Sequence, residues 1–345
     1  MKATYKRYVL EFKKPSGTSR GVLKTKETWF IKLQKADQIG IGECGILRGL
    51  SIDDRPDYEE KLQWLCDHIN RNKAELFEEL KTYPSILFGL EMALKSFESS
   101  NPFELFQTDF VNQNRGIPIN GLIWMGTKEF MLEQIKEKMN AGFRCIKLKI
   151  GAIDFEKELD LLKFIRSNFS DEVLELRVDA NGAFSPETAM DKLEALSQFN
   201  LHSIEQPIKA GQFSAMHKLC QKTPLPIALD EELIGVFEEK DSSELLDQIQ
   251  PQYIILKPSL VGGFKESLNW IELAEKRNIG WWITSALESN IGLNAIAQFT
   301  SMLDTKMPQG LGTGSLYTNN ITSPLEVKGD QIFYKQTQKW QKNII

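Results

Sequence analysis

The sequence has few residues that typically bind zinc or form disulfides: four cysteines and three histidines among 345 residues. The cysteines show no Cys-x-x-Cys spacing, and the histidines form no cluster along the chain. A disulfide framework or a zinc site needs such residues at close, regular spacing. We therefore predict neither, and we assign these residues to the core or the surface: Cys44, Cys66, Cys145, Cys220, His68, His202 and His217.

Long apolar runs and a net positive charge are also absent. No stretch approaches the roughly 20 apolar residues of a membrane-spanning helix, and no long apolar region follows the first residues. The formal net charge of -5 provides no basic surface for nucleic acid or an anionic membrane. We therefore expect a cytoplasmic protein that binds neither. The sequence does not predict an oligomeric state.

The length favours two domains. Apolar residues make up 41% and charged residues 26% of the chain, as is ordinary for a globular protein. A chain of 345 residues exceeds the usual size of one core, although an α/β barrel can reach about 250 residues as a single domain. One barrel with a smaller domain fits best.

The first 112 residues read as an α+β domain. Residues 4–13, 27–34 and 38–43 have strand character, and residues 15–21 between the first two are predicted as a loop. Residues 56–80 then show helical spacing of apolar residues, and a second helix starts near residue 84 with Ser85 as its N-cap.

A repeat of strands and amphipathic helices occupies residues 113–321. We place strand starts near residues 117, 145, 175, 203, 226, 253, 280 and 309. Such a repeat requires parallel pairing, and eight strands close a barrel more readily than they form an open sheet. An open doubly wound sheet is the alternative, but no Gly-x-Gly-x-x-Gly pattern follows the first strand. A hairpin at residues 325–334 is predicted to return to the N-terminal domain, which residues 322–345 would complete.

Charged residues stand at the carboxyl ends of five predicted strands. Each has an ordinary explanation: a lysine in solvent on an edge strand, a turn residue, a surface acid or a helix N-cap. Together, acids on three successive strand ends with lysines on the two flanking strands favour an active site, which in a barrel lies at these ends. The residues are Lys147, Lys149, Asp179, Glu205, Asp230 and Lys257.

This residue set suits the removal of a proton beside a carboxylate. Three carboxylates in a small space repel one another unless a hard cation such as Mg²⁺, or Mn²⁺ in its place, neutralises them. The ion would stabilise the enediolate that forms when a carbon beside the substrate carboxylate loses a proton. Lysines are then the bases, and we expect nearby positive charge to lower their pKa. A small-molecule carboxylate is the expected substrate.

The Lys-x-Lys strand, the three acids and the later Lys257 resemble the enolase superfamily, in its muconate-lactonizing subgroup. The resemblance implies an α/β fold, a modified TIM barrel of (β/α)7β type with an α+β capping domain. Residues 88–94 resemble the family's cap helix. The loop with Ser19 and Arg20 and the segment 44–50 would close over the substrate.

Residues 285–292 and 310–316 are similar to the late strands of the o-succinylbenzoate synthases of this subgroup. The resemblance implies syn dehydration of a succinyl-hydroxycyclohexadiene carboxylate in menaquinone biosynthesis. Lys149 would be base and then acid, Lys257 would lie over the ring, and Lys147 would tune Lys149. Arg177 would hold the succinate carboxylate. The full set of expected substrate-binding residues is Ser19, Arg20, Arg177, Asn181, Ser285, Gly312 and Thr313.

Two alternatives stay open. Asn290 stands where many relatives have glycine, and Ala286 lies within the same segment, so tail recognition can differ. An N-acylamino-acid racemase or a dipeptide epimerase would use the same machinery, although Gly312-Thr313-Gly314 lacks the Asp-x-Asp that epimerases carry there. The non-enzyme alternative is an inactive barrel that binds ligand.

Overall fold

The computed structural model describes residues 1–18, 21–303 and 305–341. Ser19 and Arg20, which we predicted to contact the substrate, lie outside the described residues. No helix in the described ranges combines the length and the apolar content that a membrane crossing requires.

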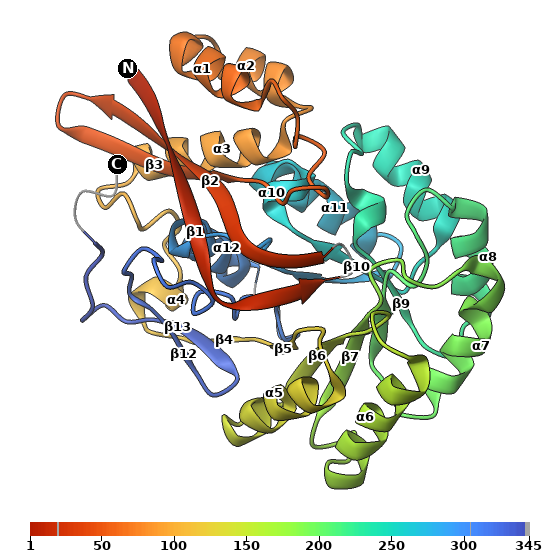
Figure 1. Ribbon diagram of the computed structural model, residues 1–345. Helices are drawn as coiled ribbons and strands as arrows, with labels where there is room; N and C mark the ends of the chain where they lie inside the picture. Colours follow the sequence, from red (N-terminus) through yellow and green to blue (C-terminus); the bar gives the residue numbers. More distant parts are fainter. Residues whose placement is uncertain (19–20, 304, 342–345) are drawn as a thin grey trace.

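A three-stranded antiparallel sheet forms the N-terminal region (Figure 1). Its strands, in spatial order, are β1 (Lys2–Thr18), β2 (Gly21–Lys35) and β3 (Gln38–Gly45). The loop predicted at residues 15–21 is shorter than expected, because residues 16–18 still pair with residues 21–23. A register shift between Glu11 and Ser16 lets the pairing continue past Pro15, which has no N–H to donate.

Helices cover this sheet on one side. The helical pattern predicted at residues 56–80 is two helices, α1 (Tyr58–His68) and α2 (Lys73–Leu80), because Asn72 caps α2 by accepting from the N–H of Ala74 at 2.9 Å. The following helix α3 (Pro84–Glu98) packs on β3. The approach is close enough that a Cβ on Gly42 would lie 2.0 Å from the Gly89 carbonyl oxygen.

The predicted N-cap of α3 is wrong. Tyr83 occupies that position, and Pro84 begins the helix with its fixed φ. Ser85 is buried one residue further on, where its hydroxyl and its N–H both donate to Asp53 Oδ2, at 2.6 Å and 2.9 Å.

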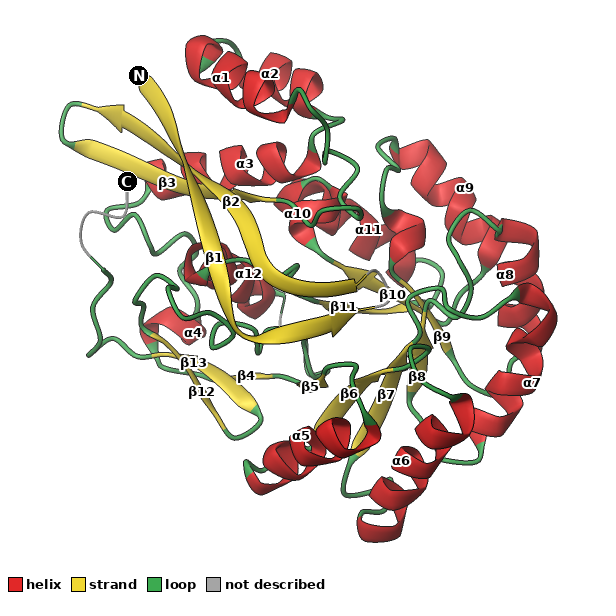
Figure 2. Ribbon diagram, viewed as in Figure 1, coloured by secondary structure: helices red, strands yellow, loops and turns green. Residues whose placement is uncertain are grey.

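Seven parallel strands form a curled sheet surrounded by helices (Figure 2). They follow one another in chain order: β5 (Gly121–Ile123), β6 (Cys145–Lys149), β7 (Glu175–Asp179), β8 (Ser203–Glu205), β9 (Ile227–Leu229), β10 (Tyr253–Leu256) and β11 (Gly280–Ile283). The predicted eighth strand is reduced to two bridges, Ile119 with Gln309 and Thr284 with Gly310, which join the two edges. The modified barrel with a capping sheet is confirmed.

Helices connect the strands: α5 (Lys128–Asn140), α6 (Phe155–Asn168), α7 (Pro186–Ser197), α8 (Phe213–Lys222), α9 (Glu239–Ile249), α10 (Pro258–Val261), α11 (Gly263–Glu275) and α12 (Asn290–Met302), with a 3-10 turn at Glu231–Leu233.

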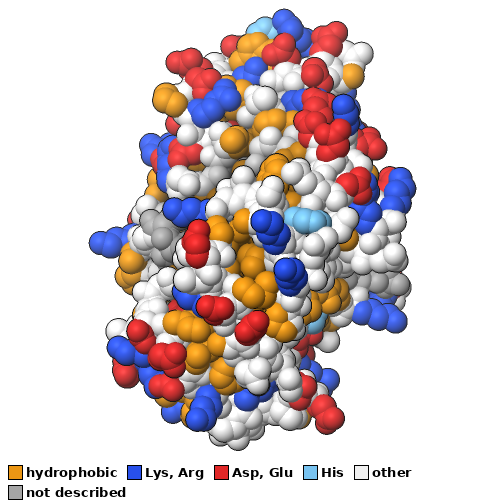
Figure 3. Space-filling view, turned by 90° about the vertical axis from the view of Figure 1, so that its right-hand side faces the viewer, with side chains coloured by type: hydrophobic (Ala, Val, Ile, Leu, Met, Phe, Trp, Pro, Cys, Tyr) orange, Lys and Arg blue, Asp and Glu red, His pale blue; other side chains and the backbone are white. Residues whose placement is uncertain are grey.

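On the face seen in Figure 3, acidic and basic side chains are interspersed, as the small net charge leads one to expect.

The strand predicted at residue 117 is divided between two sheets. β4 (Ile117–Pro118) pairs with residues 331–332 of the C-terminal hairpin, and the barrel strand β5 begins at Gly121. The C-terminal hairpin of β12 (Leu325–Lys328) and β13 (Gln331–Tyr334) is present as predicted. It pairs with β4 rather than with the N-terminal sheet, and β13 contacts the short helix α4 (Asp109–Asn112).

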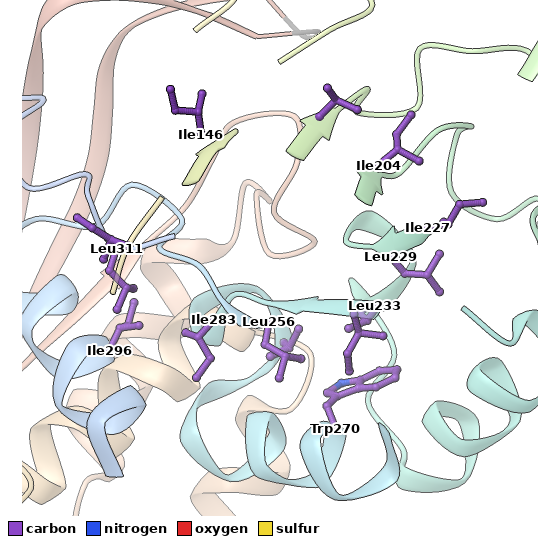
Figure 4. Close-up of a cluster of buried hydrophobic side chains, with 14 of the residues drawn as sticks. Ile146, Ile204, Ile227, Leu229, Leu233, Leu256, Trp270, Ile283, Ile296 and Leu311 are labelled. Atoms are coloured by element: carbon purple, nitrogen blue, oxygen red, sulfur yellow. The ribbon is translucent and has the colours of Figure 1, made fainter. Parts of the chain in front are cut away.

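The largest apolar core lies in the barrel region, where strands and helices pack together (Figure 4). Ile146, Ile204, Leu256 and Ile283 come from four different strands and are all 0% exposed. Their burial keeps the strands in fixed register, which places the carboxyl ends of neighbouring strands side by side.

Candidate active site

The alternation of β6 divides its side chains as predicted. Ile146, Leu148 and Ile150 are buried in the core. Lys147 and Lys149 project to the opposite face, into the barrel, where their side chains are 7% and 13% exposed. The side chains are not in solvent, so the edge-strand interpretation of these two lysines is wrong.

The three predicted acids and the three lysines form one connected cluster. The Lys149 ammonium lies 2.8 Å from Asp179 Oδ2. Lys147 lies 3.3 Å from the same oxygen and 2.6 Å from Glu205 Oε2. Lys257 lies 3.8 Å from Glu205 Oε1 and also contacts Asp230 Oδ2. The strand ends therefore bring together all six residues that the sequence predicted.

The two outer lysines stand on either side of the three acids in the order of the strands. Lys149 ends β6 and Lys257 follows β10. The strands β7, β8 and β9 lie between β6 and β10 in the sheet. The acids of those intervening strands lie between the lysines. A ligand bound over the acids would therefore meet an amine from each side.

Burial and mutual repulsion raise the pKa of Glu205 to about 8, because the carboxylates of Asp179 and Asp230 lie nearby. Although burial alone would raise it, the ammonium groups of Lys149 and Lys147 hold the pKa of Asp179 well below its usual value. The acids are thus close enough to one another to change their protonation.

The expected lowering of the lysine pKa is wrong for Lys147 and Lys257. Burial favours a lower pKa for Lys147, but the carboxylates of Glu205 and Asp179 outweigh it and raise the value. Asp230 and Glu205 likewise outweigh burial and raise the pKa of Lys257. These carboxylates are the groups that a divalent cation would neutralise.

The acid cluster fits a hard cation in its chemistry. All three candidate ligands supply oxygen, as Mg²⁺ prefers. Glu205 Oε1 is buried and accepts no hydrogen bond from any described residue, so it has a lone pair available for an ion. Within the described ranges no three His, Cys, Asp or Glu side chains form a ready ligand group as they stand, and lysine ammonium groups pair with these acids.

A cavity of about 860 Å³ opens beside the cluster. Lys147, Lys149 and Lys257 line it from the barrel. The β1–β2 hairpin reaches over the barrel (Figure 1). Two isolated β-bridges join them there, one between Gly17 and Met125 and one between Phe12 and Tyr317. The capping region supplies Lys13, Lys14, Ser16, Leu47, Arg48 and Leu50 to the wall.

Most of the described substrate-binding candidates line this cavity. Ser285, Gly312 and Thr313 do so, and the Thr313 hydroxyl lies 3.0 Å from the Ser285 hydroxyl. Asn181 also lines it and links two charged groups: its Oδ1 accepts from Lys149 at 2.8 Å, and its amide donates to Glu231 at 3.1 Å.

Arg177 does not line this cavity, so its predicted role in binding the substrate is wrong. The side chain is 1% exposed, donates to Glu175 at 2.7 Å and to the Pro308 carbonyl at 3.0 Å, and lies over the Trp282 ring. Strand periodicity put it on the correct face, but a strand rises about 3.3 Å per residue. Two residues before Asp179, Arg177 therefore lies one layer deeper in the barrel.

Sequence reasoning missed several residues of the site. Glu231 lines the cavity beside Asp230, and its place directly after a predicted ligand was a usable signal. Asn120 and Trp124 line it from the two ends of β5, the first barrel strand, whose start we had placed too early. Lys13 belongs to the capping region, and no local pattern marks it. Leu47, Arg48 and Leu50 line the cavity from the segment 44–50, which we expected to close over the substrate.

A buried acid holds the loop that follows Lys149. Glu158 of α6 is 2% exposed and accepts from the N–H of Gly151 at 2.7 Å. Burial raises its pKa from 4.5 to about 7. Because the folded state then holds this proton more tightly than the unfolded chain, the contribution of Glu158 to stability is greatest below pH 4.5 and is lost as the pH rises through about 7.

We expect Glu158→Gln to remove this pH dependence. Relative to the unchanged protein, the variant should gain about 1–3 kcal/mol in free energy of unfolding between pH 5 and pH 8. Urea denaturation at both pH values measures the difference. Glu156→Gln, at an exposed position of the same helix, is the control. An equal difference at both pH values would contradict the assignment.

Comparison with known families identifies the class of protein. A family described as Enolase C-terminal domain-like matches residues 131–335, and one described as MenC, N-terminal domain matches residues 1–97. The chain therefore belongs to the enolase superfamily, as its barrel and its lysine and acid cluster indicate.

Particular relatives are similar over nearly the whole chain. An o-succinylbenzoate synthase from Desulfotalea psychrophila is 49% identical, over 95% of this chain and 98% of its own. The crystal structure of MenC from that organism matches with a TM-score of 0.86 at 45% identity, over 96% of this chain and 99% of the other. A D-Ala-D/L-Ala epimerase from Cytophaga hutchinsonii is 27% identical, over 84% and 80% of the two chains.

Proposed function

We propose that this protein is an o-succinylbenzoate synthase of menaquinone biosynthesis. It removes water from 2-succinyl-6-hydroxy-2,4-cyclohexadiene-1-carboxylate and forms 2-succinylbenzoate. The observation that carries the proposal is the 49% identity with a synthase over almost the full length of both chains. The lysine and acid cluster supplies the groups that this reaction requires.

Lys149 is the proposed base and acid. It removes the proton from the ring carbon that bears the carboxylate, and it returns that proton to the neighbouring hydroxyl, which leaves as water. The electron pair of the broken C–H bond becomes part of the aromatic ring, so the reaction balances without an oxidant. Asp179 and Asn181 both lie 2.8 Å from the amine and fix its position.

The other two lysines act through their charge. Lys257 approaches from the far side of the acids, where its ammonium stabilises negative charge on the ring by facing its π system. Lys147 lies deeper, between Asp179 and Glu205. From there it influences Lys149 and the bound carboxylate without touching the reacting carbon.

Asp179, Glu205 and Asp230 are the residues that would hold Mg²⁺, or Mn²⁺ in its place, and Glu205 Oε1 has an unused lone pair for it. The bound ion would neutralise the negative charge that develops on the substrate carboxylate. Ser285, Gly312 and Thr313 face the cavity and suit the succinyl tail, whereas Arg177 has no part in binding it.

An N-acylamino-acid racemase is the second candidate. It is favoured by the placement of Lys149 and Lys257 on opposite sides of the acids, because racemisation needs a base on each face of the α-carbon. Gly312-Thr313-Gly314 offers no acid pair for a free amino group, which counts against a dipeptide epimerase.

Loss of absorbance of the cyclohexadiene with formation of 2-succinylbenzoate tests the proposal directly. We expect Mg²⁺-dependent dehydration. Exchange of the α-proton of N-succinylamino acids in deuterated water without dehydration would instead identify a racemase. An inactive ligand-binding barrel would show neither reaction, and calorimetry would detect no binding of Mg²⁺.

A further inference from the structure

A buried carboxylate of the N-terminal sheet binds the helix after β11. Glu43 of β3 is 0% exposed. Its Oε1 accepts from the N–H of Ser289 at 2.8 Å and from the Thr28 hydroxyl at 2.9 Å. Its Oε2 accepts from the Ser289 hydroxyl at 2.5 Å and from the N–H of Gly292 at 2.7 Å. Three of these four donors belong to the start of α12, in the barrel.

The start of α12 is shaped for this carboxylate. A buried carboxylate is stable only where donors replace its lost hydration, and the N-terminus of a helix adds a favourable dipole. A Cβ on Gly292 would lie 2.9 Å from Glu43 Oε2 and 2.8 Å from the Glu288 Cβ. A side chain at position 292 would therefore force the carboxylate out of place.

The segment that Glu43 holds forms one wall of the active-site cavity. Leu287 has a φ of 64°, a left-handed conformation that a leucine rarely adopts and that the surrounding contacts must maintain. The Ser285 hydroxyl accepts from the N–H of Leu287 at 3.0 Å and donates to Glu288 at 2.7 Å. The wall residues are Ser285, Ala286, Leu287, Asn290 and Leu293.

A similar contact elsewhere provides a comparison. Glu91 of α3 accepts from the N–H groups of Phe264 and Lys265 in the first turn of α11. The cavity-lining residues that the structure describes include none of these three. Both acids join the capping region to a barrel helix, but Glu43 alone of the two holds a wall of the active site.

We propose that Glu43 is a positioning residue of the active site: it fixes residues 285–293 from the N-terminal sheet and so sets how the succinyl tail is bound. The identity of the tail rests on the proposed function, whereas the fixing of the wall does not. Other contacts hold Lys149 and the acids, so loss of Glu43 affects substrate binding more than proton transfer.

Glu43→Gln tests this role, because its amide N–H₂ would face donors at one of the two oxygen positions. We expect KM for the cyclohexadiene substrate to rise on the order of 10–100-fold, as for a misplaced binding group, with kcat little changed. Amide hydrogen exchange across residues 285–293 should become faster. Glu91→Gln should lower the melting temperature without either change.

Unchanged KM and unchanged exchange in Glu43→Gln would overturn the proposal, and so would an equal rise in KM in Glu91→Gln. If the unchanged protein dehydrates nothing, the proposed function fails while the exchange experiment still decides the role of Glu43. Should Glu43→Gln fail to fold, Thr28→Val removes one donor and should produce the same changes at smaller size. The absence of those changes would also overturn the proposal.

Discussion

Lys149→Ala is expected to abolish measurable dehydration. Loss of general acid–base catalysis alone typically costs 10²–10⁴-fold in rate, and here one amine serves both as base and as acid. The reduction in kcat should therefore reach about 10⁴-fold or more. Steady-state kinetics at saturating Mg²⁺ measure it.

Lys149→Arg separates proton transfer from charge. Arginine keeps a positive group beside Asp179, but it does not lose its proton in proteins and so cannot act as the base. We expect this variant to be as inactive as Lys149→Ala. Lys138→Ala is the control, because Lys138 lines the same cavity from α5 with its ammonium over the Phe143 ring. Dehydration by either Lys149 variant at the normal rate would contradict the assignment.

Asp230→Asn is expected to weaken both Mg²⁺ binding and turnover. The change removes one negative charge from the proposed ligand set and the ion pair with Lys257. Since even outer-shell substitutions typically reduce metal affinity 10–100-fold, the loss at a direct ligand should be at least about 100-fold. Calorimetric titration with Mg²⁺ and the Mg²⁺ dependence of kcat provide two measurements.

Glu232→Gln is the matched control for Asp230→Asn. Glu232 is a buried acid two residues further on, but it accepts from Gly211 and Gln206 rather than from a lysine of the cluster. Its replacement should leave Mg²⁺ affinity unchanged. Equal Mg²⁺ affinity in Asp230→Asn and the unchanged protein would exclude Asp230 as a ligand.

The positions of the acids and lysines could be predicted because a local rule fixes them. Each stands at or near the end of a buried strand, and the spacing of strands in the sequence placed the second to the seventh within one residue of the observed starts. The first begins later than predicted, and the eighth is reduced to two bridges. Since parallel strands end at the same edge, Asp179, Glu205 and Asp230 had to lie together. No knowledge of distant contacts was needed.

Two kinds of feature could not be predicted: the depth of a side chain along the barrel axis, and contacts between residues far apart in the sequence. The face of Arg177 followed from its periodicity, but its depth depended on where β7 sits in the barrel. Ser85 looked like an N-cap, yet its partner Asp53 lies 32 residues earlier. The contact between Glu43 and Ser289 joins residues 246 apart, and nothing in either segment indicates the other.

A crystal structure with Mg²⁺ and 2-succinylbenzoate tests the central claim most directly. We expect one ion bound at about 2.0–2.1 Å by oxygens of Asp179, Glu205 and Asp230, with the ring carboxylate beside it and Lys149 and Lys257 on opposite faces of the ring. An ion held elsewhere, or a product molecule with both amines on one side of its ring, would contradict the account.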